Sequence, residues 1–205
     1  MPELGLFPLP IVLVPTERIP LHIFEPRYLE LITECHSSDE EFGLVLATGD
    51  GAVHEIGTRA AVIEVLEELD DGRLNIVVEG RERFRLLELT DGRSFKTAVV
   101  EPVVDEAEAP DPADTERSLE LFRELAKVAD SDVDVPAADS QLLDFELAAR
   151  VDFGTDAKQE LLASTSPRTR MARLVELLEV SIEALRRERQ LRELAGRNGK
   201  VSSSP

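Results

Sequence analysis

The residues of this chain that could carry out chemistry are few and widely spaced. There is one cysteine, Cys35, and there are three histidines, His22, His36 and His54. Cys35 and His36 are adjacent, so on a helix their side chains point to different sides, and the four residues do not follow the ligand spacing of a zinc site. We therefore expect neither a metal nor a cofactor.

The sequence also lacks the motifs of phosphate binding and covalent catalysis. The stretch GRNGKVS at 196–202 shares letters with a P-loop, but Val201 stands where Ser or Thr would hold magnesium. There is no GxSxG nucleophile elbow, and no lysine has a context that would lower its pKa for a Ser–Lys pair. Acidic pairs such as Glu67–Glu68 are typical of solvated surfaces. We expect no catalytic residues and predict that the protein is not an enzyme.

The segment IPLHIFEPRYLEL at 19–31 is the most informative about local structure. Pro26 has a fixed φ and no N–H, so it suits the first position of a helix, and it pushes Glu25 toward an extended backbone. The pattern predicts a strand over 19–24 and a helix over 26–36. At this strand–helix corner we expect the first helix of the N-terminal half, which is otherwise rich in strands.

Three side chains at this corner are candidates for a role beyond the backbone turn. Arg27 in a first helical turn opposes the helix dipole, so we expect a partner carboxylate or a ligand, and we favour a structural ion pair. Phe24 and Tyr28 are expected to plug the corner between strand and helix, and the alternative is that they line a peptide groove. His22 is expected to be a strand-face histidine with a local hydrogen bond.

The first half of the chain reads as many short strands separated by turns. Asp-Gly turns at 71–72 and 91–92 and alternating apolar residues favour a closed or nearly closed barrel with one early helix. In RFRLLEL, Phe84 and Leu86 share one face, and Arg83 and Arg85 share the other. We expect strands at 6–14, 19–24, 42–47, 58–69, 74–79, 83–89 and 95–104.

After about residue 104 the pattern becomes helical. We predict a β-barrel subdomain at 1–104, an acidic, proline-bearing linker at 105–114, a helical subdomain at 115–195 and a disordered tail at 196–205. Ser166 and Pro167 have the residue types of an N-cap and a first helical position. The helices are expected at 115–129, 137–151, 156–164 and 167–195.

The net charge of −19 limits the choice of partners. It disfavours nucleic acid and anionic membrane surfaces, and no apolar run is long enough for a membrane-spanning helix. A single cysteine and the absence of a signal-peptide pattern lead us to expect a cytoplasmic protein. The last 45 residues carry a net positive charge, which either neutralises the acidic middle of the chain or attracts an acidic partner.

Taken together, the segments FPLPIVLVP (7–15), IPLHIFEPRY (19–28), FGLVLA (42–47) and EIGTRAAVIEVLEELDDGRLNIVVEGRERFRL (55–86) resemble a known family. They resemble the N-terminal domain of Lon proteases, and more closely the stand-alone bacterial substrate-binding-domain proteins without the ATPase and protease domains. The resemblance implies an α+β fold, with a PUA-like pseudo-barrel, one inserted helix, and a helical bundle ending in a long helix. The matching positions, which are at least fold-defining, are Pro20, Leu21, Phe24, Glu25, Pro26, Arg27, Tyr28, Gly57, Thr58, Gly80 and Arg83.

The resemblance implies a non-enzymatic module that binds exposed apolar segments of unfolded or client proteins. We expect its site where barrel and bundle meet, beside the corner, with Leu21, Phe24, Arg27 and Tyr28 as substrate-binding residues. One alternative is a regulatory or scaffold partner of a separate protease or ATPase, docking through the long C-terminal helix. Another is an enzyme of unrecognised chemistry with a shifted acid near Arg27. A homodimer is a further expected partner state.

Overall fold

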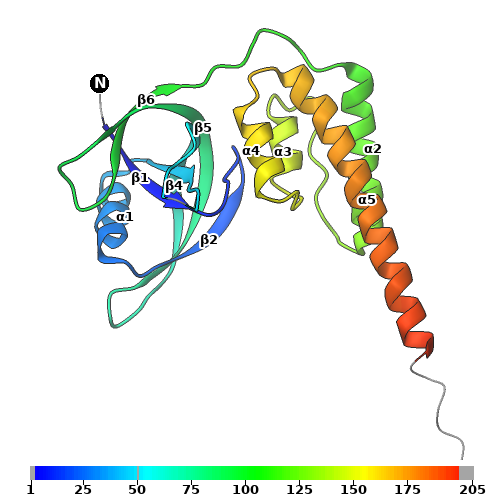
Figure 1. The fold of residues 1–205 in the computed structure, drawn as a ribbon, viewed down its shortest axis with the longest axis horizontal. Coiled ribbons are helices and arrows are strands. Elements are labelled where there is room, and N and C mark those ends of the chain that lie inside the picture. The colour runs from blue at the N-terminus through cyan, green and yellow to red at the C-terminus, as the bar shows by residue number, and fades with distance from the viewer. Residues whose placement is uncertain (1–2, 50, 199–205) are drawn as a thin grey trace, which may run out of the picture.

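The structure, a computed structural model, describes residues 3–49 and 51–198. Within these ranges six strands and five helices form two parts that lie side by side (Figure 1). One part is a curved sheet with helix α1 packed on it, and the other is a bundle of four helices. The expected α+β class is confirmed.

The sheet closes on itself. Its order is β2-β5-β4-β3-β1-β6, and β6 also pairs with β5, so five strands form a barrel and β2 extends it along β5. Strands β1 and β3 run parallel, while the other neighbouring pairs are antiparallel. The predicted closed barrel is therefore present. Its strands are β1 Glu3–Leu9, β2 Arg18–Ile23, β3 Phe42–Leu46, β4 Ile56–Glu68, β5 Leu74–Thr90 and β6 Thr97–Pro102.

The first strand is shorter than the expected 6–14. Strand β1 ends at Leu9, before Pro10, which has no N–H for a strand ladder, while Pro8 lies within the strand in register with Val45. The residues that follow still alternate in direction: Leu13 packs in the barrel core, whereas Val12 and Val14 pack against the helices. Residues 12–17, on the link from β1 to β2, are thus not a strand. They pass between the barrel and the bundle, and we call them the buried connection.

Strand β5 runs without interruption from Leu74 to Thr90, although Gly80 suggested a break between two strands. A Cβ placed on Gly80 would lie 2.2 Å from the backbone oxygen of Val14. The glycine therefore marks a close crossing of β5 by the buried connection. On its other side the Thr58 hydroxyl of β4 donates to the backbone oxygen of Leu13, 2.5 Å away.

Helix α1, Pro26–Ser38, begins at the predicted proline and packs on the barrel through Tyr28, Leu31, Ile32 and Cys35. The helices of the second part are α2 Pro112–Ala129, α3 Leu143–Ala148, α4 Thr155–Ala163 and α5 Pro167–Asn198.

The helix expected at 137–151 is wrong over most of its length, since only α3 is helical there. The Ser140 hydroxyl accepts from the backbone N–H of Leu142 at 3.3 Å, a local bond that competes with helix formation. The last helix follows its prediction more closely. The Ser166 hydroxyl accepts from the N–H of Thr169 at 3.1 Å, as an N-cap does. Helix α5 continues through Asn198, and the rest of the predicted disordered tail lies outside the described residues.

Helix α5 lies beside α2 and extends past its end (Figure 1). Four apolar residues of α5 at helical spacing form a buried stripe, namely Met171, Leu174, Leu178 and Ile182. The same hydrophobic cluster includes Val12, Val14, Leu46 and Ile56 of the barrel half. The two parts therefore share one core, and the way they meet is fixed by apolar packing as well as by polar contacts.

Candidate functional site

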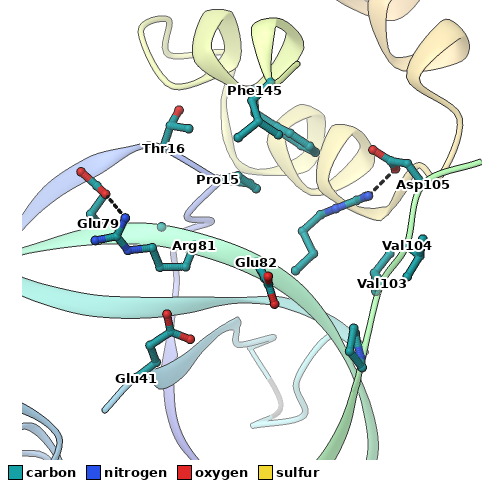
Figure 2. A pocket seen from close by; sticks show the side chains of 14 residues that line it. Pro15, Thr16, Glu41, Glu79, Arg81, Glu82, Val103, Val104, Asp105 and Phe145 are labelled. Carbon is teal, nitrogen blue, oxygen red and sulfur yellow. Dashed lines mark hydrogen bonds and ion pairs between the residues drawn. The ribbon is translucent and has the colours of Figure 1, made fainter. Parts of the chain in front are cut away.

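An open cleft of about 660 Å³ lies where the barrel meets the bundle (Figure 2). The barrel contributes the loop residues Pro15 and Thr16 together with the middle of β5, and the bundle contributes Leu142 and Phe145. The connection after β6 forms a third wall, where Val104 is 77% exposed. Leu142, which also lines the cleft, is 42% exposed. The cleft thus presents apolar side chains to solvent from two parts of the chain.

Strand β5 is bulged where it borders this cleft. Its pairing with β2 ends at Glu79, and its pairing with β6 begins at Phe84. Within the described sheet neither Arg81 nor Glu82 has a register partner, and the pairing with β4 shifts at the same place. The sheet therefore opens a short stretch of strand to the cleft between β2 and β6.

A cluster of buried charges joins the two parts at one end of the cleft. Arg170 of α5 donates through Nε to Asp144 of α3 at 2.6 Å and through Nη2 to Asp105 at 2.7 Å. Arg83 of β5 donates to the same Asp105. Both guanidinium groups lie over the ring of Phe145, 4.2 Å from its centroid for Arg170 and 5.1 Å for Arg83. Arg83, Asp105 and Phe145 also line the cleft.

The remaining donors of this cluster bind backbone oxygens at the α4–α5 turn. Arg83 donates to the oxygens of Leu162 and Ser164 at 2.8 and 2.7 Å, and Arg170 donates to Ser164 at 2.7 Å. A second link is the ion pair of Lys158 with Glu17, at 2.5 Å. Because these donors are paired inside the protein, the charges act as a joint between barrel and bundle.

The pKa values of the two carboxylates of the joint, Asp144 and Asp105, are shifted in opposite directions. Burial raises the pKa of Asp144, and this outweighs the opposing charge and hydrogen bond of Arg170. Burial also acts to raise the pKa of Asp105, but the hydrogen bonds and charges of Arg170 and Arg83 outweigh it and lower that pKa. Burial lowers the pKa of Arg83. The geometry is that of structural ion pairs.

The strand–helix corner, which was expected to adjoin this site, has a different character. Tyr28 is buried and its ring centroid lies 4.2 Å from that of Phe7, so Tyr28 is the expected plug. The plug prediction is wrong for Phe24, which is 60% exposed; Phe7 contacts Tyr28 instead. Arg27 pairs with Glu25 at 2.6 Å, which confirms a structural ion pair.

Leu21 lies on a second hollow of about 560 Å³, between β2 and the β4–β5 hairpin. His22 beside it hydrogen-bonds through Nδ1 to the side-chain oxygen of Asn75 at 2.7 Å, which confirms its expected local bond, and its ring stacks on Phe24 with 5.9 Å between centroids. Phe24 and Leu66, 60% and 53% exposed, make this region partly apolar.

The corner and the cleft are separate places. Among the described residues that line the cleft, none is Leu21, Phe24, Arg27 or Tyr28. Strand β2 starts beside the cleft and leads away from it, and six residues of strand span about 20 Å. Figure 1 accordingly shows α1 on the side of the barrel that faces away from the bundle of α2 to α5. The expectation that the junction site lies beside the corner is therefore wrong.

The sequence prediction missed the charged joint. Asp105 stood in the predicted linker, and Arg83 stood on the strand face opposite Phe84 and Leu86. Arg170 offered a usable signal, because it precedes Leu174 and Leu178 by four and eight residues and so falls on the buried stripe of α5. An arginine on an apolar helix face needs a buried partner.

Neither a membrane-spanning helix nor a metal-holding cluster is present in the described part of the chain. No helix there is long and apolar enough to cross a membrane. No group of three or more His, Cys, Asp or Glu side chains in the same residues is placed to hold a metal ion.

Comparison with known proteins identifies the family. Residues 3–180 match the ATP-dependent protease La (LON) substrate-binding domain, and the chain belongs to this family. It is 26% identical over 205 residues to the Lon protease of Brucella abortus and 27% identical over 202 residues to that of Rhizobium meliloti. Each match covers 89% of this chain and 24% of the relative, so the chain spans about a quarter of the length of these relatives.

Solved structures agree with this assignment. The crystal structure of a Lon N-terminal domain protein from Xanthomonas campestris matches with a TM-score of 0.69 and 25% identity, covering 86% of this chain and 98% of that one. The N-terminal domain of the Mycobacterium avium complex Lon protease matches with a TM-score of 0.66, covering 87% and 98%; at 16% identity it supports the fold alone. The resemblance found in the sequence is confirmed.

Proposed function

We propose that this protein is a non-catalytic binding module that holds exposed apolar segments of unfolded client proteins in the junction cleft. The observation that carries the proposal is a cleft lined by two solvent-exposed apolar side chains, Val104 after β6 and Leu142 of the bundle half, together with Phe145. The family description, a substrate-binding domain, supports protein substrates as the ligand class.

The form of the cleft suits a flexible polypeptide. Its volume of about 660 Å³ is in the usual range of ligand sites. Apolar side chains held in water favour burial by a partner, at about 25 cal/mol for each Å² removed from water. The stretch of β5 at Arg81 and Glu82 has no register partner in the described sheet, and such strand borders are where extended peptides add.

Binding of a permanently unfolded protein, reduced and alkylated, tests the proposal by fluorescence anisotropy. Val104→Asp with Leu142→Asp should weaken binding about tenfold or more, because both charges enter apolar walls. Phe24→Asp is the matched control, since Phe24 is an apolar residue away from the cleft whose exposed fraction lies between those of Val104 and Leu142, and it should change the affinity less than twofold. Failure of the unaltered protein to bind the client or to suppress its aggregation would refute the proposal.

A second proposed function uses the far end of α5, as a docking point for a separate protease or ATPase. Beyond its buried stripe the helix exposes Leu191, at 67%, and Leu194, at 49%, among several arginines. Truncation after Leu185 should abolish recovery of such a partner, identified by mass spectrometry, while client binding persists. Equal recovery with and without the segment would refute this role.

A further inference from the structure

We infer that the segment held in the junction cleft carries basic side chains next to its apolar residue. The inference rests on the proposed function and deepens it, because it assigns a charge to the bound segment. It follows from two observations. Carboxylates outnumber arginines in the lining of the cleft, and both of these arginines already have carboxylate partners.

The cleft is lined by four carboxylates and two guanidinium groups. The two arginines are already engaged: Arg81 pairs with Glu79 at 2.6 Å, and Arg83 is buried against Asp105. Figure 2 shows the pair of Arg81 with Glu79 as a dashed line. An acidic segment would therefore compete for cations that have partners. The carboxylates on the lining are Glu41, Glu79, Glu82 and Asp105.

Two of these carboxylates are available to a ligand. Glu82 is exposed and has no ion pair within the described part of the chain. The nearest cation to Glu41 is Arg59, at 3.9 Å, with both side chains partly exposed. An exposed ion pair contributes little, so a lysine or arginine of a bound segment could pair with either carboxylate at small cost. The labels in Figure 2 place Glu41 and Glu82 on the same side of the cleft.

The acidic lining continues into two hollows that share residues with the cleft. A hollow of about 390 Å³ shares Glu41 and Arg81 with it and adds Asp39 and Glu40 at the end of α1. A hollow of about 630 Å³ shares Thr16 and Glu79 with the cleft and adds Asp134 and Glu146, together with Arg18, Arg150 and Glu17, which is paired with Lys158. Each of the three adjoining hollows is lined by more carboxylates than arginines, and together we call them the acidic trough.

Charge complementarity therefore selects the occupant. A second whole copy of this chain, itself at −19, would be repelled at long range. A segment with basic and apolar residues would be attracted to the acidic trough and would bury its apolar residue against Val104 and Leu142 in the cleft. The basic end of α5 from another copy shares this chemistry, and it is an outcome that the experiment must distinguish.

The experiment compares three labelled peptides with one apolar centre, Leu-Val-Phe, flanked on each side by two Lys, two Gln or two Glu. Anisotropy at low salt should give an affinity for the Lys peptide roughly tenfold above that for the Gln peptide, as two to four exposed ion pairs provide, and the weakest binding for the Glu peptide. Salt at about 0.5 M should reduce the Lys advantage to about twofold.

Two variants on β5 locate the effect. Glu82→Lys should lower the affinity for the Lys peptide about three- to tenfold and leave the Gln peptide within twofold. Glu88→Lys makes the same charge change at another exposed glutamate of β5, away from the cleft, and should change the affinity for neither peptide beyond twofold.

The outcomes distinguish the inference about the charge of the bound segment from the proposed function on which it rests. Equal binding of the three peptides, or equal effects of both variants, would overturn the inference and leave the proposed function standing. Absence of binding by all three peptides would overturn the proposed function, and the inference with it. Competition by a peptide of residues 186–198, together with self-association on a sizing column, would identify α5 of a second copy as the occupant and overturn the assignment to client segments.

Discussion

The strand–helix corner and the barrel–bundle junction are stabilised by different means. At the corner Arg27 pairs at the surface with Glu25, two residues away, and Tyr28 packs on Phe7 of the neighbouring strand β1. At the junction Arg170 and Asp144, 2% and 4% exposed, form an ion pair inside a shared hydrophobic core. The corner follows from local rules, whereas the junction exists only once the chain has folded.

This difference indicates where binding can occur. A buried ion pair costs desolvation and is seldom more stabilising than an apolar contact of the same size, although it fixes geometry when both partners are present. The junction combines such a joint with an open apolar cleft, so its walls keep a defined spacing while facing solvent. The corner has no comparable arrangement, because its plug is closed by packing.

Loss of Arg170 should have the largest effect on stability. Arg170→Met leaves Asp144 buried without its partner, and we expect the free energy of unfolding to fall by about 3–5 kcal/mol in urea titration. Arg27→Met at the exposed corner pair should cost less than about 1 kcal/mol. Adding Asp144→Leu to Arg170→Met should restore part of the stability. A similar loss from both single substitutions would remove the contrast between the two regions.

The two aromatic residues of the corner should differ almost as sharply. Tyr28→Ala empties a buried site against Phe7 and should cost about 3 kcal/mol in the same titration. Phe24→Ala removes a largely exposed ring and should cost less than about 1 kcal/mol. Equal costs would mean that Phe24, and not Tyr28 alone, closes the corner.

Cys35 on the buried face of α1 reports on opening of the corner. Burial, with the nearby charges of Glu40 and Glu34, raises the pKa of its thiol to about 11. At pH 8 its thiolate fraction, and hence its alkylation rate, should be about a hundredfold below that of an ordinary cysteine. Mass spectrometry after timed iodoacetamide labelling checks this. Tyr28→Ala should accelerate labelling, and Glu82→Lys at the cleft should leave the rate unchanged.

The acid dependence of stability should separate the two carboxylates of the joint. The lowered folded pKa of Asp105 means that its contribution is present above the unfolded value of about 3.9 and is lost as pH falls through the folded value. Asp105→Asn should therefore flatten the decline in stability below pH 4. Asp144 has a raised pKa, so Asp144→Asn should instead remove a loss of stability that develops as pH rises above about 4. Parallel curves for wild type and both variants would contradict these assignments.

Local pattern predicted the barrel and the corner well, for physical reasons. Pro26 admits few backbone choices, and alternation along the strands records which face is buried. The joint escaped prediction because Arg83, Asp105 and Arg170 meet only in the tertiary fold, with no spacing that links them. The helix predicted over 137–151 was too long, because the turn at Ser140 competes with helix formation at its start and only α3 is helical there. The PUA-like type of the barrel and the division at 104 and 115 stay predictions.

The central claim is that client segments bind at the junction cleft and not at the corner. A photo-crosslinking amino acid placed at Val104, and separately at Phe24, tests this directly, because both side chains are exposed and apolar. With an unfolded client, we predict crosslinks from position 104 that an excess of unlabelled Lys-flanked peptide abolishes, and only background from position 24. Crosslinks from position 24 with background at 104 would contradict the account.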